Sequence, residues 1–382
     1  MKWLFLVHQV PAPKPRTRVM LWGMTKKVVA GRARKSSIPR NSTPLKHRPL
    51  LPALLCCLAA ASLLPRVARA QEREAFAMRQ VQNLPLHDVQ GRLEHFTIDK
   101  QRKRVIFSCL DNNTVQIVDA FDGTQIHRIE GLSKPRGTFY LAEGDKLYVA
   151  NAADGHVNVY DGTKFTLITT IDFGKDPDNL RFDAAAKRLY VGYGDGAIGV
   201  IDVTTNKRLD IDYKLDGHPE GFQLTTKGPE IFVNVTGKKD IAVIDRTTGK
   251  VTKWALPAGQ SANSSIVLDE AHRCVLIGSR KPPRLIVLNM ESRAVVAKLP
   301  FTGDIGEIFY DAERRRVYVA GSEGFLSVFQ QTSADHYTEM GKYPTAIGAR
   351  TGVWYANRDQ LYLFAPSGTL GARLLVFEAQ NN

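Results

Sequence analysis

Cysteine is scarce in this sequence. The 382 residues contain four cysteines, and two of them, Cys56 and Cys57, lie in one apolar segment near the N-terminus. Cys109 and Cys274 lie in apolar runs of the remaining chain, so we expect two separate buried thiols and no disulfide. The CxxCH motif of covalent haem, the HExxH and CxxC motifs of metal sites and the GxSxG motif of serine hydrolases are also absent. The sequence therefore offers no recognisable catalytic motif.

Acidic residues are missing from the first 70 positions, which contain 14 basic residues. Residues 71–382 hold 38 basic and 38 acidic residues, so the formal charge of +14 belongs to the N-terminal segment. A broadly basic body that binds nucleic acid is therefore not expected.

The N-terminal segment has the parts of a secretory signal peptide. Residues 50–64 carry no charge, basic residues precede them, and Ala68-Arg69-Ala70 forms a small-x-small cleavage site. Fifteen apolar positions fall short of the roughly 20 needed to span a bilayer. We expect cleavage after Ala70, no stable membrane anchor afterwards, and a periplasmic or secreted domain at 71–382. Met1, Met20 and Met24 are alternative starts.

A short apolar pattern recurs seven times at intervals of 42 or 44 residues. Its copies begin at Val105, Leu147, Leu189, Ile231, Val275, Val317 and Leu361. A second pattern follows about ten residues later, as in VQIVD ending at Asp119, VNVYD ending at Asp161 and IAVID ending at Asp245. Both patterns are short, rich in Val, Ile, Tyr and Phe and separated by turn residues, which is typical of strands. In the second pattern the apolar residues alternate with small or polar ones, as in a half-buried strand.

Around 42 residues with four strands form one propeller blade, as in WD40-like repeats. The sequence therefore predicts an all-β fold, a seven-bladed β-propeller of four-stranded blades in a single domain. The seventh repeat runs out after its third strand, and residues 76–86 form an extra strand before the first repeat. We expect this N-terminal strand to complete the last blade and close the ring.

The segment YVAN at 148–151, followed by DGHVNVYD at 154–161, resembles the YVTN-type propeller repeat of bacterial secreted proteins, in its YncE-like branch. The resemblance covers about 300 residues and implies the same propeller fold. It does not imply an activity, because propellers of this kind have mixed roles. Repeats five to seven depart from the pattern, since their closing Asp is replaced and Arg-Lys-Pro-Pro (280–283) stands in place of the usual turn.

The first residues of the innermost strands should ring the mouth of the central channel. The inner strands are predicted to end near Asp99, Leu141, Asp183, Thr225, Asp269, Asp311 and Tyr355. Counting back four and five positions from these ends gives a ring rich in ionisable groups, which is the usual sign of a polar ligand site. The candidate ligand-binding residues, of which Asn263 lies just outside the counted pairs, are His95, Arg136, Asp178, Asn179, Glu220, Asn263, Glu307 and Arg350. The basic segments 280–284 and 314–316 are expected to be solvated loops.

These observations favour a non-catalytic propeller that binds a small polar or anionic molecule, or a protein partner, at the channel mouth. The alternatives are a lactonase-type hydrolase that uses the rim carboxylates with or without a metal, and a redox propeller that carries a cofactor. We predict no cofactor and no metal ligands, although a divalent cation on the rim carboxylates stays an alternative. We expect a monomer.

Overall fold

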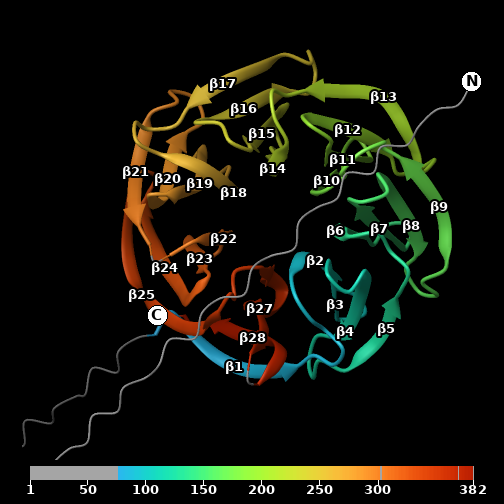
Figure 1. Cartoon of the computed structure of the whole chain (residues 1–382). Coiled ribbons are helices and arrows are strands. Elements are labelled where there is room, and N and C mark those ends of the chain that lie inside the picture. Colours follow the sequence, from blue (N-terminus) through green and yellow to red (C-terminus); the bar gives the residue numbers. More distant parts are fainter. Residues whose placement is uncertain (1–75, 302, 369, 382) are drawn as a thin grey trace, which may run out of the picture. The chain divides into compact units, whose positions relative to one another are not determined.

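The computed structural model describes residues 76–301, 303–368 and 370–381. The predicted signal peptide and its cleavage site lie outside these residues. Within them the chain forms seven four-stranded antiparallel sheets around a central axis (Figure 1). The all-β, seven-bladed propeller predicted from the repeats is thus confirmed. The part of the chain that the structure describes contains no helix long and apolar enough to cross a membrane.

The first four blades follow one another along the chain, each running from the innermost to the outermost strand. Their strands are β2 (Leu93–Asp99), β3 (Arg104–Cys109), β4 (Thr114–Asp119) and β5 (Gln125–Ile129); β6 (Pro135–Leu141), β7 (Lys146–Asn151), β8 (His156–Asp161) and β9 (Leu167–Asp172); β10 (Leu180–Asp183), β11 (Arg188–Tyr193), β12 (Ala197–Asp202) and β13 (Lys207–Lys214); and β14 (Pro219–Leu224), β15 (Glu230–Val235), β16 (Asp240–Asp245) and β17 (Val251–Ala255).

The fifth and sixth blades repeat this order, and the seventh takes its outer strand from the other end of the chain. The strands are β18 (Ser261–Asp269), β19 (Cys274–Lys281), β20 (Pro283–Asn289) and β21 (Val295–Pro300); β22 (Ile305–Asp311), β23 (Arg316–Gly321), β24 (Glu323–Ser333) and β25 (His336–Ile347); and β26 (Gly352–Tyr355), β27 (Gln360–Gly368), β28 (Gly371–Ala379) and β1 (Met78–Pro85). A 3-10 turn, η1 (Ala356–Arg358), joins β26 to β27.

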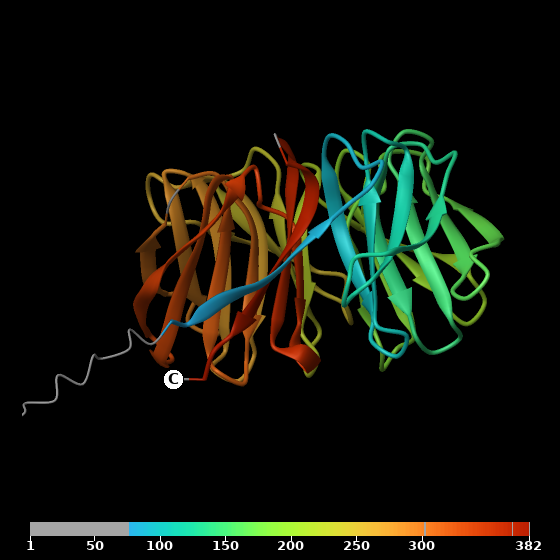
Figure 2. The same cartoon turned by 90° about the horizontal axis from the view of Figure 1, so that it is seen from below.

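The ring closes where β1 pairs antiparallel with β28. The register runs from Met78 opposite Ala379 to Pro85 opposite Arg373. In the side view β1 lies along the outer edge of the last blade, next to the strands from the C-terminal end (Figure 2). The prediction that the N-terminal strand completes the last blade is confirmed, and the pairing covers an edge that would otherwise be exposed.

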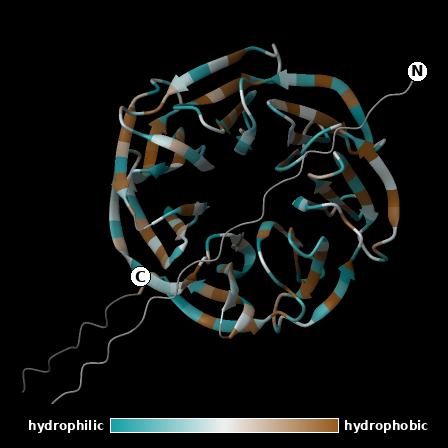
Figure 3. Ribbon diagram, in the orientation of Figure 1, coloured by the Kyte–Doolittle hydropathy of each residue, from teal (hydrophilic) through white to brown (hydrophobic). Residues whose placement is uncertain are grey.

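The hydrophobic core lies between adjacent blades. Phe107 of the first blade packs with Tyr362 of the seventh, and Tyr148 of the second blade packs with Leu189 of the third. Hydrophobic segments recur along the strands of every blade (Figure 3), and the most completely buried strands are the two in the middle of a blade, such as β3 and β4. Each fully buried large side chain contributes about 1.5–3 kcal/mol, so the blades stabilise one another around the ring.

The recurring Asp at the end of the third strand has a local role. Asp119, Asp161, Asp202 and Asp245 each accept hydrogen bonds from the backbone N–H groups two and three residues further on. Asn289, the replacement in the fifth blade, does the same. These Asx turns reverse the chain between the third and fourth strands. The Asp recurs because each blade needs the same turn at this place.

Cys109 and Cys274 are both buried and free, as predicted. The prediction for residues 314–316 was wrong in part. Arg316 is 4% exposed and donates to the carbonyl of Gln380, while Arg314 is paired with Asp311 and Asp359. These two arginines fasten the sixth blade to the seventh instead of lying in solvent.

Candidate ligand-binding site at the channel mouth

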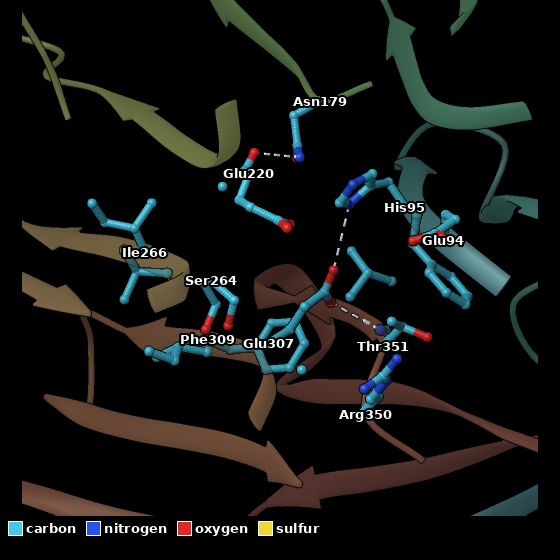
Figure 4. A pocket seen from close by; sticks show the side chains of 18 of the residues that line it. Glu94, His95, Asn179, Glu220, Ser264, Ile266, Glu307, Phe309, Arg350 and Thr351 are labelled. Carbon is cyan, nitrogen blue, oxygen red and sulfur yellow. Dashed lines mark hydrogen bonds and ion pairs between the residues drawn. The ribbon is translucent and has the colours of Figure 1, made fainter. Parts of the chain in front are cut away.

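A cavity of about 590 Å³ occupies the central channel, surrounded by the seven inner strands. We call the end at which these strands begin the channel mouth. Because consecutive repeats are in register, residues at equivalent positions of different blades meet there. Seven of the eight predicted residues line the cavity, namely His95, Arg136, Asp178, Asn179, Glu220, Glu307 and Arg350. In Figure 4, His95, Asn179, Glu220 and Glu307 come from different blades and lie around the same space.

Asn263 is the one predicted residue that the structure places outside the lining. Its side chain is 4% exposed and donates to the Asn234 side chain (2.9 Å) and to the carbonyl of Asp240 (3.2 Å). Counting back four and five positions from Asp269, the end of β18, gives Ser265 and Ser264, and both line the cavity. Asn263 lies one position further from the strand end. The equivalent residues of other blades, such as Leu93 and Ile305, are also buried and do not line the cavity.

Glycines beside the charged residues allow the inner strands to approach one another at the mouth. A Cβ atom on Gly137 would lie 2.0 Å from the carbonyl oxygen of Asp178, and one on Gly306 would lie 2.0 Å from that of Arg350. Neither position accepts a larger residue unless the neighbouring backbone moves. The glycines thus bring the functional side chains of adjacent blades into one small space.

His95 lies between two carboxylates. Its Nε2 is 3.3 Å from Oδ1 of Asp178 and its Nδ1 is 3.6 Å from Oε1 of Glu307, so the ring spans the channel from the first blade to the third and sixth. Burial opposes protonation, but the two carboxylates outweigh it and raise the pKa of His95 to about 10. The imidazole is therefore a cation at neutral pH.

Asp178 contacts more basic side chains than any other carboxylate of the site. Its side chain is buried and also accepts a 2.8 Å hydrogen bond from Arg136. Nε2 of His218 lies 3.6 Å away, and this proximity raises the pKa of His218. Burial acts to raise the pKa of Asp178, but His218, His95 and Arg136 together lower it far below its usual range.

His218 was missed by sequence reasoning. It lies just before β14, one residue outside the inner strand and beyond the positions that were counted back from the strand end. His218 does not line the cavity itself, but its Nδ1 is 2.7 Å from the Gly194 carbonyl oxygen and its Nε2 reaches Asp178. The only available signal was a histidine immediately preceding an inner strand.

A second charged cluster lies at the opposite side of the mouth. Asp304 pairs with Arg350 at 2.5 Å and with Arg280 at 2.9 Å. Nε of Arg280 also donates to the carbonyl of Ile305, and its side chain lines the cavity. Residues 280–284 were expected to be a solvated loop; that interpretation was wrong for Arg280, because β19 and β20 extend further than the repeat suggests.

The remaining carboxylates are held differently. Glu94 is largely buried and pairs with Arg92 at 2.7 Å, and burial raises the pKa of Glu94. Glu307 accepts the backbone N–H of Gly352 through its second oxygen. Glu220 accepts a 3.3 Å hydrogen bond from Thr236, and no described cation lies within 4.0 Å of it.

Several buried polar atoms at the mouth have no hydrogen-bond partner in the described protein. They are Oδ1 of Asn179, Nε of Arg136 and the hydroxyl oxygens of Ser264 and Ser265. Buried polar groups are almost always satisfied, so these unpaired atoms distinguish the mouth from the rest of the core. No three His, Cys, Asp or Glu side chains within the described ranges are grouped so as to hold a metal ion.

Comparisons with known proteins bear on the fold. No family model matches the chain, and no curated protein matches it. A chain from a structure of hydrazine synthase of Kuenenia stuttgartiensis is similar at 16% identity and a TM-score of 0.64, over 75% of this chain and 97% of that one. A chain from a crystal structure of a mitotic checkpoint complex is similar at 12% identity and a TM-score of 0.68, over 86% and 100%. At such identities the likeness supports the propeller fold alone.

Proposed function

We propose that this chain is a secreted or periplasmic propeller of the YVTN type that binds a small polar or anionic molecule at the channel mouth without transforming it. The observation that carries the proposal is the convergence of His95, Arg136, Asp178 and Glu307 on one cavity, whose lining residues also include buried polar atoms without a partner. Convergent polar groups in a preformed hollow are the usual mark of a ligand site.

The state of the charges favours binding over catalysis. A general base needs a pKa near the working pH, but the pKa of His95 is raised to about 10 and the pKa of Asp178 is far below its usual range. Both groups therefore keep their charge at neutral pH. A fixed array of charges recognises a ligand and gives it an orientation. We accordingly propose a small-molecule ligand, a monomer and no catalytic turnover, with a protein partner as the alternative.

A thermal-shift panel tests this function. It contains sugar acids, lactones, divalent metals with chelator controls, peptides and short oligonucleotides. A ligand at 100 times its dissociation constant stabilises the folded state by about 2.7 kcal/mol. We expect an anionic or polar hit that Glu307→Ala and Arg136→Ala abolish.

The matched control is Glu130→Ala, which removes a surface carboxylate whose side chain is 65% exposed. This variant should keep the hit. A panel without any hit among polar and anionic compounds would contradict the proposal and direct the search to a protein partner. Turnover of a lactone that is lost in Glu307→Ala would establish the hydrolase alternative instead.

A further inference from the structure

Arg181 is the only charged residue at its level of the channel. It lies two residues before the end of inner strand β10 and lines the cavity below the mouth. The residues at the equivalent position of the other six inner strands are Thr97, Phe139, Gln223, Val267, Phe309 and Val353. A guanidinium thus lies among uncharged and mostly apolar neighbours.

Arg181 also differs from the other arginines of the cavity. Arg92, Arg136, Arg280 and Arg350 each pair with a carboxylate within 3.0 Å. Arg181 has no carboxylate within 4.0 Å among the residues that the structure describes. Arg181 therefore differs from the other four arginines of the cavity, whose charges are balanced by carboxylates of the protein.

The contacts of Arg181 leave most of its donors free. Nη1 donates to the backbone carbonyl of Leu180 at 2.8 Å, and the guanidinium lies 5.7 Å from the centre of the Phe222 ring. A guanidinium carries five N–H donors and stays charged in proteins. Burial lowers the pKa of Arg181, and Glu307 and Asp178 act against that effect only from a distance. A desolvated cation without a partner is unfavourable. An anion that enters the channel and pairs with Arg181 would therefore bind favourably.

The surroundings of Arg181 define what kind of anion fits. Gln223, at the equivalent position of the next blade, lines the cavity and donates no hydrogen bond to the described residues, so its amide is a second free donor. Ile266, Val267 and Phe309 supply apolar walls. In Figure 4, Ile266 and Phe309 lie on the side of the cavity away from His95.

We propose that the ligand is an organic monocarboxylate, whose carboxylate binds Arg181 below the mouth and whose apolar body lies against Ile266, Val267 and Phe309. This inference rests on the proposed function, because it names the ligand class of the same cavity. A carboxylate matches the two-pronged geometry of one guanidinium. A phosphate would bring more oxygens and more charge than one arginine and one amide can satisfy among apolar walls.

The test uses benzoate as the probe and the neutral amide benzamide as its isostere. Binding to the purified protein is measured by calorimetry and by thermal shift, at constant ionic strength, with chloride and sulfate as inorganic competitors. The variants are Arg181→Met, which keeps most of the length of the side chain, and Arg181→Lys, which keeps the charge but lacks the two parallel N–H donors of the guanidinium. The control is Arg293→Met, because Arg293 also lies over an aromatic ring, 5.2 Å from the centre of Trp254, but outside the cavity.

We expect benzoate to bind the wild type and Arg293→Met equally and benzamide to bind neither. Arg181→Met should weaken benzoate about 10- to 100-fold, as expected for the loss of hydrogen bonds to a charged group, and Arg181→Lys should fall between. Without ligand, Arg181→Met should melt at a higher temperature than the wild type, because it removes an unpaired cation.

Two results would overturn the inference. One is that benzoate binds the wild type and Arg181→Met alike or binds neither; the other is that sulfate or chloride occupies the Arg181 site as tightly as benzoate does. If the panel of polar compounds gives a hit that depends on Arg136 and Glu307 but not on Arg181, the proposed function stands and this inference fails. If no compound binds at the mouth either, both fail.

Discussion

Replacing Asp178 by Asn tests whether the mouth is one interdependent network. The substitution keeps the shape of the side chain and removes its charge. Asp178 is 5% exposed and lies next to three basic side chains, with Arg136 at 2.8 Å, His95 at 3.3 Å and His218 at 3.6 Å. Removing one partner of a buried ion pair leaves the others uncompensated and costs about 3–5 kcal/mol. We therefore expect a loss of unfolding free energy in that range.

The assay combines urea unfolding with an NMR titration of the His95 ring. Since Asp178 is one of the two carboxylates that raise the pKa of His95, that pKa should fall in the variant. The control is Glu130→Gln, which removes an exposed partner of Arg128 and should cost about 1 kcal/mol or less. A cost below about 1 kcal/mol for Asp178→Asn, or an unchanged titration of His95, would refute the argument that these charges depend on one another.

Other predictions concern pH, closure, thiols and packing. Because the pKa of His95 is raised from 6.5 to about 10, its stabilising contribution is complete below pH 6.5 and is lost as the pH rises toward 10, so urea unfolding should show a decline over this window that His95→Gln lacks. Deletion of residues 76–85 should lower the melting temperature and expose the edge of β28, which size-exclusion chromatography would detect as association. Burial raises the pKa of Cys109 to about 12 and that of Cys274 to about 11, so Ellman's reagent should modify neither until urea unfolds the protein; reaction in the native state would contradict this. Gly306→Ala should destabilise by about 1–3 kcal/mol or more, since its Cβ would lie 2.0 Å from the Arg350 carbonyl oxygen, and a stability equal to wild type would count against the close approach.

The architecture could be predicted because the same strand pattern is repeated seven times in the sequence of a seven-bladed propeller. The inner strands were predicted to end at Asp99, Leu141, Asp183, Thr225, Asp269, Asp311 and Tyr355, and the structure agrees at every blade but the fourth, where β14 ends at Leu224. The repeat period, the composition of the strands and the turn residues all indicate a seven-bladed propeller. A fold can be predicted from one sequence when local and global signals agree in this way.

The site could be predicted only in part, because the direction of a side chain depends on its exact place along the strand and on its neighbours in space. Asn263 lies six positions before the end of β18, where the equivalent residues of other blades, such as Leu93 and Ile305, are also buried. His218 entered from a loop, and the extension of β19 carried Arg280 to the mouth. Arg181 lay in the same periodic pattern, two positions nearer the strand end. Its lack of a carboxylate partner depends on distances between blades, which no spacing in the sequence expresses.

The pairing of β1 with β28 also has a consequence for how the chain reaches its native state. Met78 is synthesised early and Ala379 late, yet the two lie opposite each other in one sheet. A nascent chain can form its blades one after another, but the ring stays open until β28 has been made. Contacts of such long sequence separation form slowly. A chain that stops short of β28 has no partner for β1, so only a chain that includes both strands can seal the channel within a closed ring.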